Sequence, residues 1–166
     1  MTAKERFLNY VKYETASDEN SPSCPSTTGQ TVLLKALKDE LSAMGAIAKQ
    51  DDNGYVTAVI PATKKGLKKL CFISHADTSP AVSGKGVNPQ IIVYEGGDVT
   101  LKSGLKITLN DNPELEKYLG KELIVTDGTT LLGADDKAGV AEIMTAAEIL
   151  CKNKDIAHGD ILIAFT

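Results

Sequence analysis

Two short segments contain the residues whose types and spacing could do chemistry. In the first, FISHADTSP, His75 and Asp77 stand two positions apart at the end of an apolar run. If the chain is still extended there, both side chains point to the same side. A histidine beside a carboxylate is the usual form of a metal ligand with the partner that fixes its ring tautomer. The pair is therefore a candidate metal site, although a partly buried histidine bonded to a nearby acid in a loop would show the same pattern.

The second segment, LLGADDKAG, places Asp135 and Asp136 at the expected start of a helix. A helix N-terminus stabilises negative charge by up to about 1 kcal/mol, so helix capping alone would explain both acids. Like His75, however, they follow a strand-like apolar stretch and should lie at the carboxyl edge of the same sheet. One carboxylate can bridge two divalent ions about 3.5–4 Å apart in hydrolytic two-metal sites. His75 and one of these acids would supply half of such a site, because a catalytic zinc takes three protein ligands.

Other catalytic arrangements have weaker support. Ser74, His75 and Asp77 are neighbours along one strand and cannot form the geometry of a hydrolase triad. The chain contains no G-x-S-x-G, no P-loop and no G-x-G-x-x-G after a strand. Cys71 lies inside an apolar run and is expected in the core. The second histidine, His158, is expected in a turn at the opposite end of the sheet from His75.

Composition narrows the class of protein. The 166 residues have 42% hydrophobic content and a net charge of -4, without a long basic run, so nucleic acid is not an expected partner. Three widely spaced cysteines indicate reduced thiols. The N-terminus lacks the apolar core of a signal peptide, and no window reaches the length of a membrane span. We therefore expect a soluble, cytoplasmic protein without a membrane partner; its oligomeric state is not predicted.

Hydrophobic periodicity predicts the elements that must position these side chains. Helices are expected over residues 3–13 and over a second stretch that ends at Gly45, with one apolar face formed by Val32, Leu33, Leu37, Leu41 and Met44. AIAKQ and YVTAVI should form a hairpin around Asn53 and Gly54, both with positive φ. LCFIS is expected as a strand buried on both faces. The section from Ser79 to Gly120 shows only short β-like pieces.

The last third of the chain predicts the fold class. ELIVT, GVAEIMTAAEIL and DILIAFT alternate as strand, helix and strand, which indicates a right-handed βαβ unit. We therefore expect an α/β fold in which helices flank a mixed, partly parallel sheet. Because the sequence stops at Thr166 directly after an apolar strand, where site residues usually follow, we expect a fragment of a larger domain.

Several segments together carry a family resemblance. It rests on ERFLNYVKYET, FISHADTSP, GKGVNPQI, YEGGD, TDGTTLLGADDKAGVAEI and HGDILIAFT, which run in order over nearly the whole chain. The chain resembles the peptidase T family of tripeptide aminopeptidases, within the wider group of co-catalytic zinc hydrolases. The resemblance implies a zinc-binding α/β catalytic domain, interrupted in the family by a smaller domain. Residues 1–166 would be the N-terminal portion of the catalytic domain, with its remainder and the smaller domain absent.

The resemblance also implies roles for individual residues. His75 corresponds to a ligand of one zinc, Asp77 to the active-site acid that supports this histidine, and Asp135 to the carboxylate that bridges two zincs. Asp136 has no ligand role in the family pattern and is expected to be structural. The general base and the other ligands of the family have no counterpart in this sequence. The expected function is zinc-dependent removal of the N-terminal residue from tripeptides by the complete enzyme, and the isolated chain is expected to be inactive.

Two alternatives stay open at this point. The first is a non-catalytic α/β binding module or remnant, which would need no metal. The second is a related zinc amidase that acts on acylated amino acids.

Overall fold

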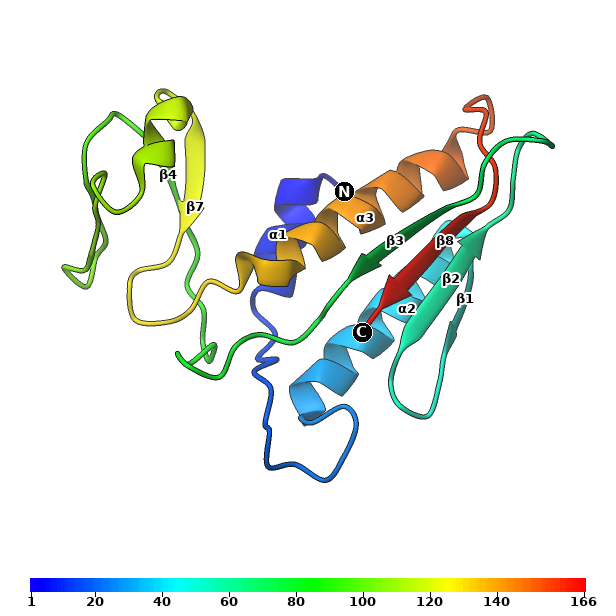
Figure 1. Ribbon diagram of the computed structural model, residues 1–166, viewed down its shortest axis with the longest axis horizontal. Helices are drawn as coiled ribbons and strands as arrows, with labels where there is room; N and C mark the ends of the chain where they lie inside the picture. Colours follow the sequence, from blue (N-terminus) through cyan, green and yellow to red (C-terminus); the bar gives the residue numbers. More distant parts are fainter.

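A four-stranded sheet with three helices forms the main unit of the chain, and a small β lobe lies beside it (Figure 1). The computed structural model describes all residues 1–166. The helices are α1 (Ala3–Tyr10), α2 (Thr28–Met44), α3 (Ala134–Lys152) and the 3-10 helix η1 (Pro113–Tyr118). The strands are β1 (Ile47–Gln50), β2 (Val56–Ile60), β3 (Leu70–Ser74), β4 (Gln90–Val93), β5 (Val99–Thr100), β6 (Lys106–Ile107), β7 (Glu122–Val125) and β8 (Ile161–Phe165).

The main sheet has the strand order β1-β2-β8-β3. β8 pairs antiparallel with β2 and parallel with β3, so the sheet is mixed and partly parallel, as the sequence predicts. The predicted hairpin is confirmed, since β1 and β2 pair antiparallel. Of its two turn residues only Gly54 has a positive φ, of 86°, and the expectation for Asn53 is wrong.

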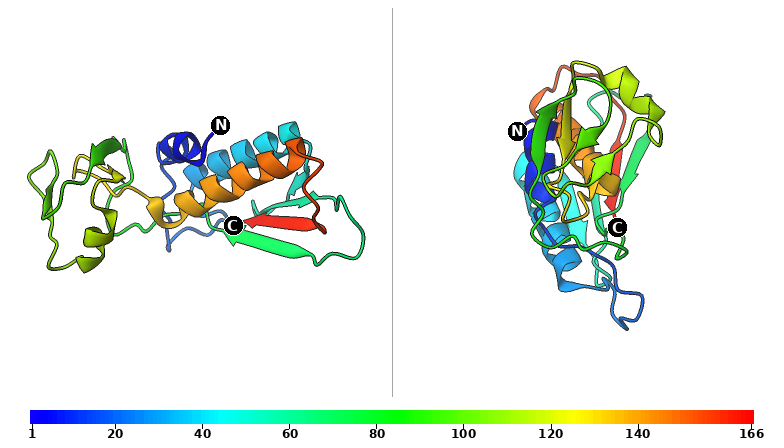
Figure 2. Two further views of the ribbon diagram at one scale, coloured as in Figure 1. Left: turned by 90° about the horizontal axis from the view of Figure 1, so that it is seen from above. Right: turned by 90° about the vertical axis from the view of Figure 1, so that its left-hand side faces the viewer.

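The three α-helices cover one face of this sheet (Figure 2). Alternate residues of β2 and β8 point into this layer and are buried, which is the period-2 pattern of a half-covered sheet. The core between the layers includes Leu33, Leu37 and Leu41 of α2, with Val140 and Met144 of α3. The chain therefore builds one hydrophobic core between helices and sheet.

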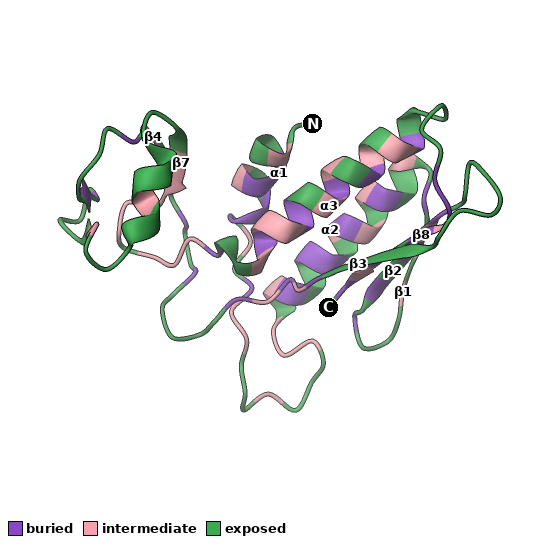
Figure 3. Cartoon of the chain, turned by 45° about the horizontal axis from the view of Figure 1, so that its top comes forward, coloured by how far each residue is buried: buried purple, intermediate pink, exposed green.

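The opposite face of the sheet carries no helix, and this corrects one sequence expectation. β3 is not buried on both faces: only its last residue is buried, and Ile73 is 67% exposed (Figure 3). The reason is that β3 lies at the edge of the sheet and that its outward side chains reach the uncovered face. Cys71 is exposed for the same reason, rather than in the core. Strand sequence alone does not reveal how many layers cover a sheet.

The expected βαβ unit uses a different first strand. The strand directly before α3, β7, pairs with β4 in a separate two-stranded sheet. The parallel neighbour of β8 is β3, so the crossover unit is β3, α3 and β8, with residues 75–133 inserted before the helix. Strands that are neighbours in the sequence usually pair, but here the inserted segment separates β3 from α3 and forms sheets of its own.

The inserted segment forms the small lobe, which has its own core. Tyr94, Val99 and Leu101 are buried there, against the two short sheets β4-β7 and β5-β6. An ion pair between Lys4 of α1 and Glu122 of β7, 2.8 Å apart, links the lobe to the main unit. Because the lobe lies between β3 and α3 in the chain, His75 and Asp135 are 60 positions apart in the sequence.

Helix boundaries differ from the predictions in small ways. α1 ends at Tyr10 rather than near residue 13. α2 ends before Gly45, as predicted, because Gly45 adopts a left-handed conformation with φ 97°. Leu33, Leu37 and Leu41 are buried as predicted, but Val32 is 50% exposed and Leu34 is buried instead. None of the helices combines the length and apolar character that a membrane-spanning segment requires.

A buried arginine joins the three α-helices. The side chain of Arg6 on α1 is 2% exposed and lies 2.9 Å from Glu40 on α2 and 2.7 Å from Glu148 on α3. Tyr10 donates a hydrogen bond of 2.6 Å to Glu40. Because the charged groups pair with one another, burial of the arginine is compensated.

Candidate metal centre

His75 follows β3 directly and is held by the acid two residues later. Its Nδ1 lies 3.0 Å from the carboxylate Oδ1 of Asp77 and 3.0 Å from the Asp77 carbonyl oxygen. Both oxygens can only accept a hydrogen bond, so they favour the tautomer with hydrogen on Nδ1. In the neutral form of this tautomer, Nε2 carries the lone pair that could bind a metal. A carboxylate that fixes the ring in this way is a common feature of metal-ligating histidines.

Asp135 meets this imidazole from the other end of the inserted lobe. Its Oδ1 lies 3.0 Å from His75 Nε2, and the Asp135 side chain is 95% exposed. His75, Asp77 and Asp135 all line one open hollow of about 420 Å³. The structure thus brings together the three residues that the sequence singles out.

Opposing effects act on the charge of His75. Partial burial lowers the pKa of the imidazole, and the neighbouring carboxylates of Asp135 and Asp77 raise it by more, so the net pKa lies above its usual value. The site therefore attracts positive charge, whether a proton or a cation.

Helix capping does not explain the two acids. Asp135 and Asp136 have φ/ψ values of -88/106° and -121/33°, outside the helical region, so the regular part of α3 begins at Lys137. Neither carboxylate accepts a hydrogen bond from a backbone N–H of the helix. The expectation that both acids lie in a regular first helical turn is therefore wrong in detail.

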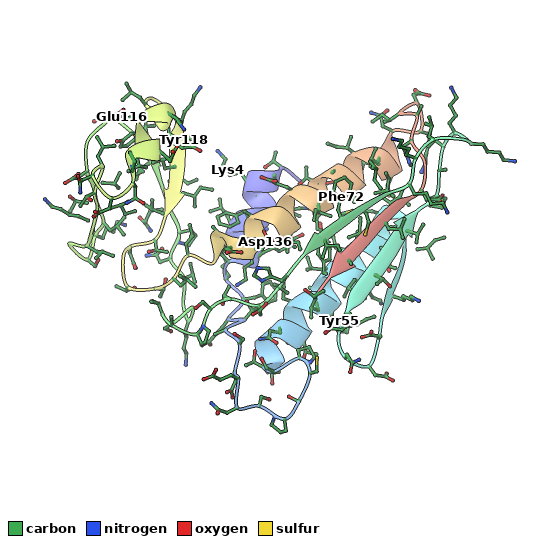
Figure 4. The ribbon with its side chains drawn as sticks, viewed as in Figure 1. Lys4, Tyr55, Phe72, Glu116, Tyr118 and Asp136 are labelled. Atoms are coloured by element: carbon green, nitrogen blue, oxygen red, sulfur yellow. The ribbon has the colours of Figure 1, made fainter.

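Asp136 points to β3 rather than into the hollow. Its Oδ2 accepts a hydrogen bond of 2.6 Å from the hydroxyl of Ser74, which also lies 3.0 Å from the Asp136 carbonyl oxygen. Figure 4 labels Asp136 where α3 begins. Of the two adjacent acids, Asp135 therefore faces His75, and Asp136 is hydrogen-bonded to Ser74 at the end of β3.

Lys137 anchors the same turn from the opposite side. Its ammonium group donates a hydrogen bond of 2.7 Å to the carbonyl oxygen of Tyr13, and the residue is 2% exposed. Burial lowers the pKa of Lys137 to about 8. The residue after the acidic pair is therefore part of the interior and not of a solvated surface.

The donor set fits part of a zinc site. Imidazole nitrogen and carboxylate oxygen are both common zinc ligands, at about 2.0–2.2 Å, and two ligands of one tetrahedral zinc lie about 3.4 Å apart. The 3.0 Å between His75 Nε2 and Asp135 Oδ1 is close to this value, so a small rotation of the exposed Asp135 side chain would suffice. No group of three or more His, Cys, Asp or Glu side chains that could hold a metal occurs in the chain. The chain thus offers two ligands and not a complete coordination sphere.

His158 lies away from this site, as the sequence predicts. It precedes β8, at the end of the sheet opposite to His75, and its Nδ1 lies 2.7 Å from the carbonyl oxygen of Gly159. Its backbone pairs with Thr63, which fixes the turn between α3 and β8.

Sequence reasoning missed the contacts of Ser74 and Lys137. A serine at the end of an apolar run and a lysine beside two acids both look like ordinary surface residues. The only available signal was their position directly next to His75 and Asp136.

Known proteins with similar sequences include several that are longer than this chain. No protein-family model matches the chain. Peptidase T of Caldanaerobacter subterraneus subsp. tengcongensis is 53% identical over 167 residues, which cover 98% of this chain and 41% of that protein. The chain therefore spans about two-fifths of the length of the curated relatives it matches.

Solved structures agree with this relationship. The aminopeptidase PepT from Bacillus cereus matches 99% of this chain, and 35% of its own chain, with a TM-score of 0.65 and 27% identity. A tripeptidase from Staphylococcus aureus matches 99% of this chain and 35% of its own, with a TM-score of 0.64. At 24% identity the second match shows the shared fold alone.

Proposed function

The chain is a homologue of peptidase T that corresponds to its N-terminal region, and from this relationship we propose that it forms part of a zinc-dependent tripeptide aminopeptidase. In this proposal His75 and Asp135 would hold zinc, with Asp135 shared between two ions, and Asp77 would support His75. The complete enzyme would contain two zincs and would act on small peptides.

One observation carries the proposal. The imidazole of His75 is held through Nδ1 by Asp77, and its Nε2 faces the Asp135 carboxylate at 3.0 Å. A purely structural ion pair would not require a third group that fixes the ring tautomer. A ligand histidine does require it, because the tautomer decides which nitrogen can bind the metal.

Each residue has a distinct task in the proposed reaction. Zinc, when bound, would polarise the scissile carbonyl and activate a water molecule for attack. His75 and Asp135, which line the hollow, would hold the metal, and Asp77 would keep the His75 proton on Nδ1. Because a catalytic zinc takes three protein ligands, we propose that further ligands and the general base come from the part of the polypeptide that the relatives have beyond the matched region. The isolated 166 residues would then lack activity.

A chimaera tests this function directly. Residues 1–166 would replace the matching segment of the Caldanaerobacter peptidase T, which supplies the rest of the enzyme. We expect hydrolysis of tripeptides that depends on zinc and falls by at least about 10³-fold in the His75→Ala version. Dipeptides and N-acyl amino acids would serve as comparison substrates.

Two results would contradict the proposal. A folded chimaera that cleaves N-acyl amino acids in preference to tripeptides would favour the amidase alternative. A His75→Ala chimaera with unchanged tripeptide hydrolysis would remove the histidine from the site. The isolated chain, assayed in parallel, should show no hydrolysis above buffer.

A further inference from the structure

The two proposed metal ligands stand on segments that only a few contacts hold together. His75 follows β3, and Asp135 comes 60 positions later, after the small lobe. The Asp135 side chain is 95% exposed and has no hydrogen-bond partner other than His75. Its backbone lies outside the regular helix, so α3 itself does not fix it. Something else must set the spacing between the ligands.

The residues directly next to the two ligands form a cross-link. Ser74 precedes His75, Asp136 follows Asp135, and the Ser74 hydroxyl donates to Asp136 Oδ2 at 2.6 Å. The same hydroxyl lies 3.0 Å from the Asp136 carbonyl oxygen. Ser74 is 3% exposed, and its own carbonyl accepts a hydrogen bond from Thr166 N, which ties it to the neighbouring strand. The cross-link therefore starts from a rigid part of the sheet.

The first regular turn of α3 leaves room for this arrangement. A side chain at Gly139 would place its Cβ only 2.4 Å from Asp136 Oδ1. The glycine thus allows the Asp136 carboxylate to lie against the helix while it reaches Ser74. A hydrogen bond to a carboxylate is shorter and stronger than one between neutral groups, so the contact can hold the turn firmly.

We propose that Ser74 and Asp136 are positioning residues that set the distance between His75 and Asp135 and thereby the zinc affinity of the site. This inference rests on the proposed function, because it gives His75 and Asp135 the role of zinc ligands. Neither Ser74 nor Asp136 touches the metal. Partners behind metal ligands typically contribute 10- to 100-fold to metal affinity.

Zinc affinity of the 166-residue chain provides the test, because it does not depend on catalysis. Competition against a weak chromophoric chelator would measure the dissociation constant of zinc for the wild-type chain, Ser74→Ala, Asp136→Ala and the double variant. We expect about 10-fold weaker binding in Ser74→Ala, which loses both contacts with Asp136. Asp136→Ala should lose less, because the hydroxyl can still donate to the carbonyl oxygen of residue 136. The double variant should equal Ser74→Ala.

Two conservative variants separate positioning from a general loss of structure. Ser74→Thr keeps the hydroxyl and should retain zinc affinity within about threefold. Asp136→Asn keeps an acceptor of lower charge and should fall between wild type and Asp136→Ala. Ser42→Ala is the matched control, since it removes an exposed hydroxyl that donates to the Lys38 carbonyl on α2, far from the site. Far-UV circular dichroism would confirm that each variant is folded under the titration conditions.

The results separate a failure of the proposed zinc site from a failure of the positioning role. If His75→Ala binds zinc as tightly as wild type, the proposed metal role fails and the positioning role fails with it. If zinc binding depends on His75 but Ser74→Ala and Asp136→Ala bind as the wild type does, only the positioning role is wrong. Loss of affinity in Ser74→Thr as large as in Ser74→Ala would also overturn it.

Discussion

Substitution of Gly139 by alanine tests the packing behind the site. Within a helix this change normally stabilises a protein by up to about 1 kcal/mol, because glycine has the larger backbone entropy to lose. Here the new Cβ would lie 2.4 Å from Asp136 Oδ1 and 3.0 Å from its carboxyl carbon. The carboxylate must therefore turn away, and it then loses the hydrogen bond from Ser74.

The two effects have different sizes. A hydrogen bond to a charged group contributes about 1.5–3 kcal/mol, against the helix gain of about 1 kcal/mol. Gly139→Ala should therefore lower the free energy of unfolding by about 0.5–2 kcal/mol. In a Ser74→Ala background there is no bond left to lose, so the same change should be neutral or stabilising by up to about 1 kcal/mol.

Urea unfolding followed by circular dichroism at 25 °C would measure all four chains of this cycle. The expected coupling between the two positions is about 0.5–3 kcal/mol. Equal stabilisation by Gly139→Ala in both backgrounds would refute the reasoning, because it would mean that the Asp136 carboxylate moves without cost. Unequal slopes of the transitions would require a second, calorimetric measurement of the same cycle.

Three further predictions concern the framework that carries the site. Arg6→Ala should destabilise the protein by about 1–3 kcal/mol, because it leaves the partly buried Glu40 and Glu148 without this cation; a thermal midpoint within a degree of wild type would contradict this. Bonds from Lys152, then from Arg6 and the N-terminus, hold the pKa of Glu148 below its usual value, so its stabilisation is present above about pH 4.5 and is lost as the pH falls further. Glu148→Gln should thus flatten the fall in stability below that pH, and an unchanged acid profile would count against the ion pairs. Gly29→Ala should cost several kcal/mol, since its Cβ would lie 1.6 Å from the Glu14 carbonyl oxygen, and a urea midpoint equal to wild type would disprove that close approach.

Local patterns predicted much of the fold. The hairpin and the end of α2 at Gly45 follow from turn and capping chemistry, which depends on neighbouring residues. The burial of β3 and the partner of β8 did not follow, because both depend on strand order and on which faces are covered. These are properties of the whole chain, and the lobe between His75 and Asp135 carries no local signal of where it ends.

The candidate site, too, could be predicted only in part. His75 and Asp77 could be identified from their spacing at the end of a strand, and Asp135 from its place after another apolar run. The contact between Ser74 and Asp136 could not, because a hydroxyl at the end of an apolar run has the same sequence signature whether it is bonded or free. Side chains that act through a neighbour become visible only when both segments are placed in space.

Zinc soaked into crystals of the chain, with anomalous diffraction collected at the zinc edge, tests the central claim most directly. We predict an anomalous peak about 2.0–2.2 Å from both His75 Nε2 and a carboxylate oxygen of Asp135. The Asp77 carboxylate should stay on Nδ1, behind the ring. Zinc peaks at other positions, with none between His75 and Asp135 at millimolar zinc, would contradict the assignment of these two residues as metal ligands.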